Sequence, residues 1–150
     1  MKISVVVPVY NSSDTLPLLV DELRQVLPKI TPDFELILIN DCSTDSSWEV
    51  ISKLIKTYAW VRGIDLMRNY GQHNATLCGI REARYEVVVV MDDDLQNPPR
   101  EIPKLIEKLN EGFDVVYGVA RKRQTFLARR GREECLRSIL ESSDSAIIGP

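Results

Sequence analysis

The sequence is poor in the side chains that build most protein metal and redox sites. It holds one histidine, His73, and three widely separated cysteines, Cys42, Cys78 and Cys135. A single histidine excludes a multi-histidine zinc site, and cysteines without CxxC spacing indicate reduced thiols rather than a disulfide framework. No segment approaches the roughly 18 apolar residues of a membrane-spanning helix, and no secretory signal is recognisable. These absences predict a cytoplasmic chain without a transmembrane segment.

Glycine-rich phosphate-binding loops are absent as well. The apolar run at residues 3–9 is followed by Tyr10-Asn11, with neither Gly-x-Gly-x-x-Gly nor a Walker loop after it. Dinucleotide and triphosphate sites need such glycines because their backbone approaches the phosphates closely. This absence argues against a Rossmann dehydrogenase, a P-loop NTPase and a nucleotidyltransferase that makes activated sugars.

Charge is unevenly distributed along the 150 residues, whose formal net charge is -3. Residues 1–120 carry 12 Lys and Arg against 18 Asp and Glu, whereas residues 121–150 carry 7 against 4. The length and the hydrophobic content of 44% fit one globular domain with a sizeable core. The acidic body argues against nucleic acid as a partner. The basic stretch from Arg121 to Arg132 is compatible with a solvated helix, with contact to a diphosphate or anionic lipid, or with a subunit contact.

Apolar residues alternate between the spacings of strands and of helices. Strands are predicted at residues 3–9, 34–39, 61–66, 86–91 and 115–119. Helices are predicted from the apolar stripes at residues 16–27, 48–58, 74–83 and 102–109. Ser12 and Ser13 are the predicted caps of the first helix, and Ser46 with Glu49 a capping box for the second. The alternation predicts an α/β fold with an open, mostly parallel sheet and helices on both faces.

Polar residues follow each of the first four predicted strands. They are Tyr10-Asn11, Asn40-Asp41, the stretch 68–72 and the stretch 92–96. Each alone is an ordinary turn sequence. Because the carboxyl ends of parallel strands meet at one edge, where such sheets bind ligands, their convergence predicts a functional site.

Three consecutive aspartates, Asp92, Asp93 and Asp94, directly follow the apolar run at residues 87–91. Their carboxylates would repel one another unless a cation lies among them. Alternation along an extended chain would place Asp92 and Asp94 on one side and Asp93 on the other. Paired carboxylates at a strand end suit Mg²⁺ or Mn²⁺, which usually binds a substrate phosphate as well. The alternative interpretation is a solvated acidic loop.

Four motifs together carry a resemblance to a known family. They are Val6-Val7-Pro8-Val9-Tyr10-Asn11, Asn40-Asp41-Cys42-Ser43-Thr44-Asp45, Arg68-Asn69-Tyr70-Gly71-Gln72-His73 and Asp92-Asp93-Asp94-Leu95-Gln96-Asn97-Pro98-Pro99. In this order and spacing they resemble the family 2 glycosyltransferases of the GT-A fold. The last two motifs are most similar to the polyprenyl-phosphate branch, which includes dolichol-phosphate mannose synthases and bacterial undecaprenyl-phosphate sugar transferases. The resemblance covers about residues 2–125.

The resemblance implies transfer of a sugar from a UDP- or GDP-sugar, with Mg²⁺ or Mn²⁺, to a polyprenyl phosphate or another glycan acceptor. It places the protein in the cytoplasm, with peripheral contact at the cytoplasmic membrane face left open. The implied nucleotide-sugar-binding residues are Pro8, Tyr10, Asn11, Asn40, Asp41, Asn69, Gly71, Gln72, Asp92, Asp93 and Arg121. The implied metal ligands are Asp92, Asp94 and Gln96, with Asp94 as the catalytic residue. A phosphate acceptor has a second pKa of roughly 6, so no general base is required.

The chain departs from the family pattern in two loop positions and in its last part. The family's usual Asp-Asp-Gly-Ser motif begins here with Asn40, and Cys42 replaces its glycine, which strains the loop if φ there is positive. Residues 1–125 are predicted to form the nucleotide-sugar-binding domain and residues 126–150 a basic, divergent tail, with the C-terminal part of the fold missing. An uncovered apolar face then favours homo-oligomers. The rival function is a catalytically dead module that keeps the donor site without the acceptor half.

Overall fold

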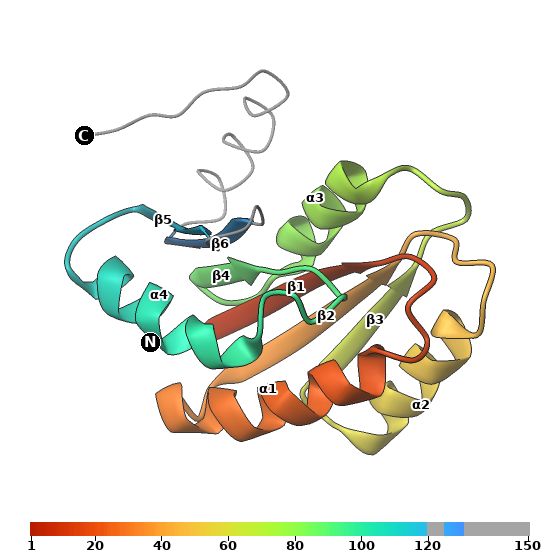
Figure 1. Cartoon of the computed structure of the whole chain (residues 1–150), viewed down its shortest axis with the longest axis horizontal. Coiled ribbons are helices and arrows are strands. Elements are labelled where there is room, and N and C mark those ends of the chain that lie inside the picture. Colours follow the sequence, from red (N-terminus) through yellow and green to blue (C-terminus); the bar gives the residue numbers. More distant parts are fainter. Residues whose placement is uncertain (120–124, 131–150) are drawn as a thin grey trace.

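The computed structural model describes residues 1–119 and 125–130, of which residues 119 and 125–130 are described by their backbone alone. Its centre is a six-stranded sheet in the order β3-β2-β1-β4-β6-β5 (Figure 1). The strands are β1 (Ile3–Val9), β2 (Phe34–Asn40), β3 (Val61–Asp65), β4 (Val87–Val90), β5 (Val115–Val119) and β6 (Thr125–Arg130). The helices are α1 (Leu16–Ile30), α2 (Ser47–Thr57), α3 (Gln72–Glu82) and α4 (Ile102–Asn110), with the 3₁₀ turn η1 (Pro99–Glu101) before α4. The first four strands are parallel, which confirms the predicted α/β class.

The helices cover both faces of the sheet, as predicted. Helices α1, α2 and α4 lie on one face and α3 on the other (Figure 1). Side chains alternate along β1, so Val5 and Val7 pack into the core on the α1 side, whereas Val6 packs into the core on the α3 side. All seven residues of β1 are therefore buried, as is typical of a central parallel strand. Within the described residues, no helix has the length and apolar character to cross a membrane.

Strand β6 is a feature that the sequence pattern does not predict. Its backbone pairs antiparallel with β4 on one side and with β5 on the other, with Val90 opposite Leu127 and Gly118 opposite Phe126. Residues 126–130, expected in a tail, thus belong to the sheet. The interpretation of the stretch from Arg121 to Arg132 as a solvated helix is therefore wrong for residues 125–130, the part that the structure describes. Arg121, in the predicted nucleotide-sugar-binding domain, lies outside the described residues, and so does the part of the predicted tail after residue 130.

The side-chain caps predicted for α1 and α2 are wrong. No side chain caps α1, and the backbone carbonyl of Ser12 accepts the N–H of Thr15 at 3.1 Å instead. Ser46 at the start of α2 likewise makes no side-chain cap hydrogen bond. The carboxylate of Asp45 takes that role and accepts the N–H of Ser47 at 3.0 Å. An aspartate one position earlier thus replaces the expected serine.

We expect Asp45→Ala to destabilise the fold by about 1 kcal/mol at neutral pH. The carboxylate of Asp45 accepts the N–H of Ser47 and, at 3.1 Å, the N–H of Ser13, which joins α2 to the loop after β1. Burial alone would raise the pKa of Asp45, but these hydrogen bonds outweigh it and lower the pKa to about 2. The stabilisation is therefore fully present above the ordinary value of 3.8 and is lost as the pH falls through about 2.

Thermal unfolding of the wild type and the Asp45→Ala variant, followed from neutral to acidic pH, checks this expectation. The matched control is Asp14→Ala, which removes another exposed carboxylate from the same part of the chain. A difference in melting temperature that does not narrow on acidification would contradict the assignment.

Gly79 allows α3 to approach the sheet closely. A Cβ atom at this position would lie 2.5 Å from Val6 Cγ1 and 2.5 Å from Ile39 Cδ1, so a neighbour has to move. Val6 is β-branched and its χ1 is stiff, so it yields little. We expect Gly79→Ala to destabilise the protein by about 1 kcal/mol, because overpacking outweighs the gain in helix propensity. Urea unfolding measures this against His73→Ala on the exposed side of α3, and an increase in stability would refute it.

Candidate functional site

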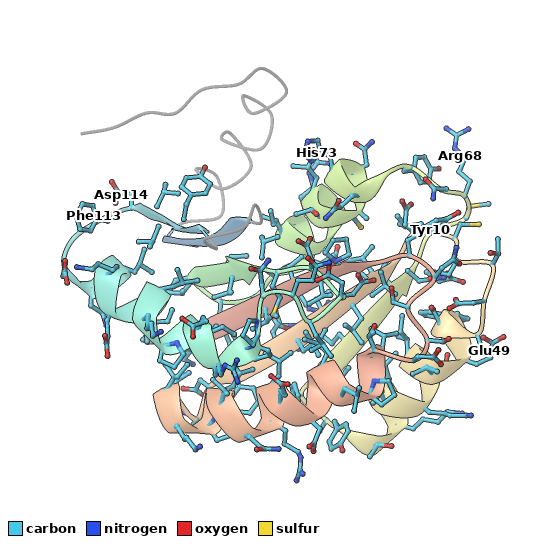
Figure 2. All side chains as sticks on the ribbon, viewed as in Figure 1. Tyr10, Glu49, Arg68, His73, Phe113 and Asp114 are labelled. Atoms are coloured by element: carbon cyan, nitrogen blue, oxygen red, sulfur yellow. The ribbon has the colours of Figure 1, made fainter. Side chains whose placement is uncertain are left out.

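A cleft of about 400 Å³ opens at the carboxyl edge of the first four strands. Its lining residues are Pro8, Val9, Tyr10, Asp41, Asn69, Gly71, Gln72, Asp92, Asp93 and Asp94. Tyr10 and Arg68 lie at this end of the molecule, whereas Phe113 and Asp114 lie at the opposite end (Figure 2). The topology thus brings all four predicted loops to one cavity, which is what their position after parallel strands predicts.

The three aspartates lie in a loop, because β4 ends at Val90 and the backbone turns, with Leu95 at a φ of 59°. The expectation that Asp93 points away from its neighbours is therefore wrong, since all three line the cleft. Asp93 accepts the N–H of Tyr10 at 3.2 Å and the hydroxyl of Ser12 at 2.5 Å. Strand alternation does not apply beyond the last paired residue.

The flanking aspartates each have a different hydrogen-bond donor. Asp92 accepts the side-chain amide of Gln72 at 2.6 Å, from the first residue of α3. Asp94 accepts the backbone N–H of Gln96 at 3.0 Å. Burial raises the pKa of Asp92, and the carboxylates of Asp94 and Asp93 raise it further. The pKa of Asp93 is also raised by burial, so the ionised forms of both carboxylates are disfavoured in the folded protein.

Asp41 fixes the shape of the cleft on the opposite side. It is 3% exposed, and its two oxygens accept the N–H of Tyr70 at 2.7 Å and the N–H of Gly71 at 2.8 Å. The side chain of Asn69 also accepts the N–H of Gly71, at 3.0 Å. Gly71 has a φ of 86°, a left-handed conformation that favours glycine. Asp41 therefore holds the loop that leads from β3 into α3.

Three predicted site residues do not line the cleft. Asn11 accepts the N–H of Thr44 through its side-chain oxygen at 2.8 Å and so braces the neighbouring loop. Asn40 is 2% exposed and donates its amide to Asp65 at 2.7 Å. Gln96 lines a second cavity beside α4 and β5, so its role as a metal ligand stays a prediction. Arg121 lies outside the described residues.

Some residues of the site are not predicted from the sequence. Val9 lines the cleft, and a valine at a strand end has no feature that distinguishes it from a core residue. The hydroxyl of Ser12 donates to Asp93, a lining residue of the cleft, although its sequence context indicates a helix cap. Asp65, the last residue of β3, holds the amide of Asn40. Its position at the carboxyl end of a strand is the one signal that could have identified it.

The strain expected at Cys42 is present, since its φ is 56°. A non-glycine residue in this conformation costs about 1–2 kcal/mol. We expect Cys42→Gly to stabilise the protein by about 1 kcal/mol, because relief of the strain exceeds the entropy cost of a glycine in the unfolded chain. Urea unfolding measures the change, and Cys42→Ala is the matched control because it keeps the Cβ atom. Equal stabilities of the two variants would count against this explanation.

Comparison with known proteins gives consistent relatives. A model of the family described as Glycosyl transferase family 2 matches residues 4–145. Over 149 residues the chain is 37% identical to the undecaprenyl-phosphate 4-deoxy-4-formamido-L-arabinose transferase of Salmonella choleraesuis (strain SC-B67) and 36% identical to that of Enterobacter sp. (strain 638). Both matches cover 99% of this chain and 46% of the relative. The chain therefore spans about half the length of the curated relatives it matches.

Solved structures have the same architecture. The mannosyltransferase PcManGT from Pyrobaculum calidifontis, in complex with GDP-Man and Mn²⁺, is similar with a TM-score of 0.74 at 20% identity, over 91% of this chain and 46% of that chain. S. aureus TarS 1-349 is similar with a TM-score of 0.62 at 25% identity, over 78% of this chain and 34% of that chain. The sheet order, the acidic loop after β4 and these matches lead to one conclusion: the chain belongs to glycosyl transferase family 2 and has the GT-A fold.

Proposed function

We propose that this chain forms the nucleotide-sugar-binding half of a metal-dependent glycosyltransferase. The sugar passes from a UDP- or GDP-sugar to a polyprenyl phosphate at the cytoplasmic face of a membrane. The main support is the cleft itself, which combines three consecutive carboxylates with Tyr10 and Asp41. Relatives named undecaprenyl-phosphate transferases support the acceptor class. Neighbours in complex with GDP-Man and Mn²⁺ or with UDP-GlcNAc have the same fold and are consistent with the donor class.

Tyr10 and Asp41 are the proposed contacts to the nucleoside. Tyr10 is 51% exposed at the cleft, so its ring is accessible to a base or a ribose. Asp41 already accepts two backbone N–H groups, and its carboxylate has further lone pairs for an imide N–H or a ribose hydroxyl. The loop that Asp41 holds contributes Asn69, Gly71 and Gln72 to the same cleft.

The other proposed contacts to the nucleotide-sugar lie around Tyr10 and Asp41. Pro8 lines the cleft near the end of β1. Asn11 and Asn40 do not line it and bond Thr44 and Asp65 in the neighbouring segments. Asp93 lines the cleft and accepts hydrogen bonds from the loop after β1. Arg121 stays a predicted contact to the diphosphate.

Asp92 and Asp94 are the proposed metal ligands, and Asp94 is the proposed catalytic residue. Their carboxylates are close enough to interact electrostatically, and carboxylate oxygens suit Mg²⁺ and Mn²⁺. No group of three or more His, Cys, Asp or Glu side chains suited to a metal occurs in the described part of the chain. The remaining ligands would thus be diphosphate oxygens and water. A bound ion supplies charge neutralisation for the departing diphosphate.

Neighbouring protein groups orient the carboxylates of Asp92 and Asp94 before a substrate binds. Gln72 donates to one oxygen of Asp92 and fixes the direction of that carboxylate. Asp93 accepts two donors, the hydroxyl of Ser12 and the N–H of Tyr10, through Oδ2, whereas Asp92 and Asp94 each accept one donor through Oδ1. The flanking carboxylates are therefore less committed to protein donors and are the proposed ligands. A phosphate acceptor is largely ionised at neutral pH. The cleft, whose lining includes no histidine, therefore needs no general base for this reaction.

Isothermal titration with UDP and with GDP, each with and without Mn²⁺, tests donor binding. We expect one nucleotide to bind at least about tenfold more tightly with the metal, because the ion bridges carboxylates and diphosphate. Transfer of a labelled sugar to undecaprenyl phosphate tests the acceptor. Absence of binding by both nucleotides would overturn the proposal, and binding without transfer would favour a donor-binding module. A second copy of the chain stays a predicted partner.

A further inference from the structure

We propose that Asp65 is a positioning residue of the nucleotide cleft and that it acts through Asn40. The proposal rests on the proposed function, because its readout is nucleotide affinity. Asn40 and Asp65 are the last residues of β2 and β3 and lie opposite each other in the parallel register. The buried amide of Asn40 donates to the carboxylate of Asp65 at 2.7 Å, and the backbone carbonyl of Asn40 accepts the N–H of Leu66 at 2.9 Å. The pair thus joins the two strand ends that precede the cleft loops.

Further hydrogen bonds connect Asn40 to the loops that follow β2 and β1. The side-chain oxygen of Asn40 accepts the N–H of Ser43 at 3.3 Å, and the hydroxyl of Ser43 accepts the N–H of Asn11 at 3.0 Å. One chain of hydrogen bonds therefore connects the carboxyl ends of β3, β2 and β1. It spans the turn that carries Asp41, which holds the loop before α3.

This turn needs support because its backbone is strained. Cys42 in this turn has a φ of 56°, and Asn11, which the same hydrogen bonds reach in the loop after β1, has a φ of 55°. Such conformations persist only where the surroundings hold them. The Asn40 amide can act as a brace only if its orientation is fixed, and the carboxylate of Asp65 fixes it by accepting the Nδ2–H. Asp65 itself does not line the cleft, so its effect on a bound nucleotide is indirect.

The pair also accounts for the departure at position 40 from the family's usual aspartate. An aspartate there would face the carboxylate of Asp65 at hydrogen-bond distance, and two carboxylates this close cannot both ionise without a large penalty. Asp65 supplies one negative charge from the neighbouring strand, and Asn40 supplies the matching donor. With the two residues exchanged, an amide at position 65 can donate to a carboxylate at position 40, which can still accept the N–H of Ser43.

Three variants test the inference: Asn40→Asp, Asp65→Asn and the exchanged pair Asn40→Asp/Asp65→Asn. Isothermal titration with the nucleotide that the wild type binds, in the presence of Mn²⁺, gives the affinities, and thermal unfolding confirms that each variant is folded. We expect Asn40→Asp to weaken binding about tenfold or more, and Asp65→Asn to weaken it only about two- to threefold, since an amide oxygen still accepts from Asn40. The exchanged pair should recover most of the loss.

The outcomes separate this inference from the proposed function. If the wild type binds the nucleotide and the exchanged pair binds it as weakly as Asn40→Asp does, the role of Asp65 is overturned and the proposed function is not. Recovery of the melting temperature without recovery of affinity would also overturn it, because the pair would then be structural only. A nucleotide affinity of Asn40→Asp equal to that of the wild type would overturn the role of Asp65 as well. Absence of nucleotide binding by the wild type would overturn the proposed function and the positioning role with it.

Discussion

Replacing Asp92 and Asp94 together by asparagine should abolish metal-dependent nucleotide binding. Asparagine keeps the shape of each side chain and removes its charge, so the variant tests the carboxylates rather than the volume of the cleft. Because changes in groups that merely support metal ligands already cost about 10–100-fold in affinity, we expect loss of both ligands to cost about 100-fold or more. Titration with UDP and GDP in Mn²⁺ measures this loss directly.

In the absence of metal, the variant with both Asp92→Asn and Asp94→Asn should be at least as stable as the wild type. The pKa of Asp92 is raised by burial and by its acidic neighbours, which means that its ionised form is disfavoured in the folded protein. At neutral pH, removal of this charge therefore raises the melting temperature of the metal-free protein. Opposite effects on stability and on binding would separate a ligand role from misfolding. Asp114→Asn, at the opposite end of the molecule (Figure 2), is the control.

The second large effect is expected for stability, from Glu35→Ala. Glu35 lies at the start of β2, far along the strand from the cleft, and its carboxylate is 5% exposed. It accepts the hydroxyl of Ser4 at 2.7 Å, the N–H of Arg84 at 2.7 Å and the guanidinium of Arg62 at 3.1 Å. Removal of this acceptor leaves the fully buried hydroxyl of Ser4 and a backbone N–H without their partner.

The expected loss is about 3 kcal/mol, at the lower end of the range for breaking a buried ion pair. The lower end applies because Arg62 is 26% exposed and keeps a second carboxylate partner, Glu82, at 3.3 Å. Urea unfolding measures the loss. The matched control is Glu82→Ala, which removes an exposed partner of the same guanidinium and should cost under about 1 kcal/mol. Similar losses in both variants would show that the buried carboxylate has no special role.

The main elements of the fold follow from the local pattern of the sequence. The apolar runs at residues 3–9 and 115–119 predict β1 and β5 with the residues that the structure shows. For β1 the physical reason is that a strand buried on both faces needs apolar side chains throughout. Apolar spacing predicts the four helices within a few residues at each end. The post-strand positions predict most of the cleft lining, since parallel topology brings those positions to one edge.

Tertiary pairing decides the features that local pattern does not encode. Strand β6 has no distinctive periodicity, and the pairing of its backbone with β4 and β5 defines it. Asp93 turns into the cleft because Ser12 and Tyr10 offer donors there, which strand alternation does not reveal. The helix caps shift for a similar reason, since Ser47 and Ser13 both find the carboxylate of Asp45.

The sequence by itself thus determined the fold class, the family resemblance and the edge at which the site lies. These depend on residue type and spacing along one segment at a time. Only the tertiary structure decided that Asn40 is bonded to Asp65 and that Asp41 holds the loop before α3. The physical reason is that a polar side chain near a strand end can meet any of several donors or acceptors. Strand register and loop geometry, set by packing of the whole sheet, select which partner it meets.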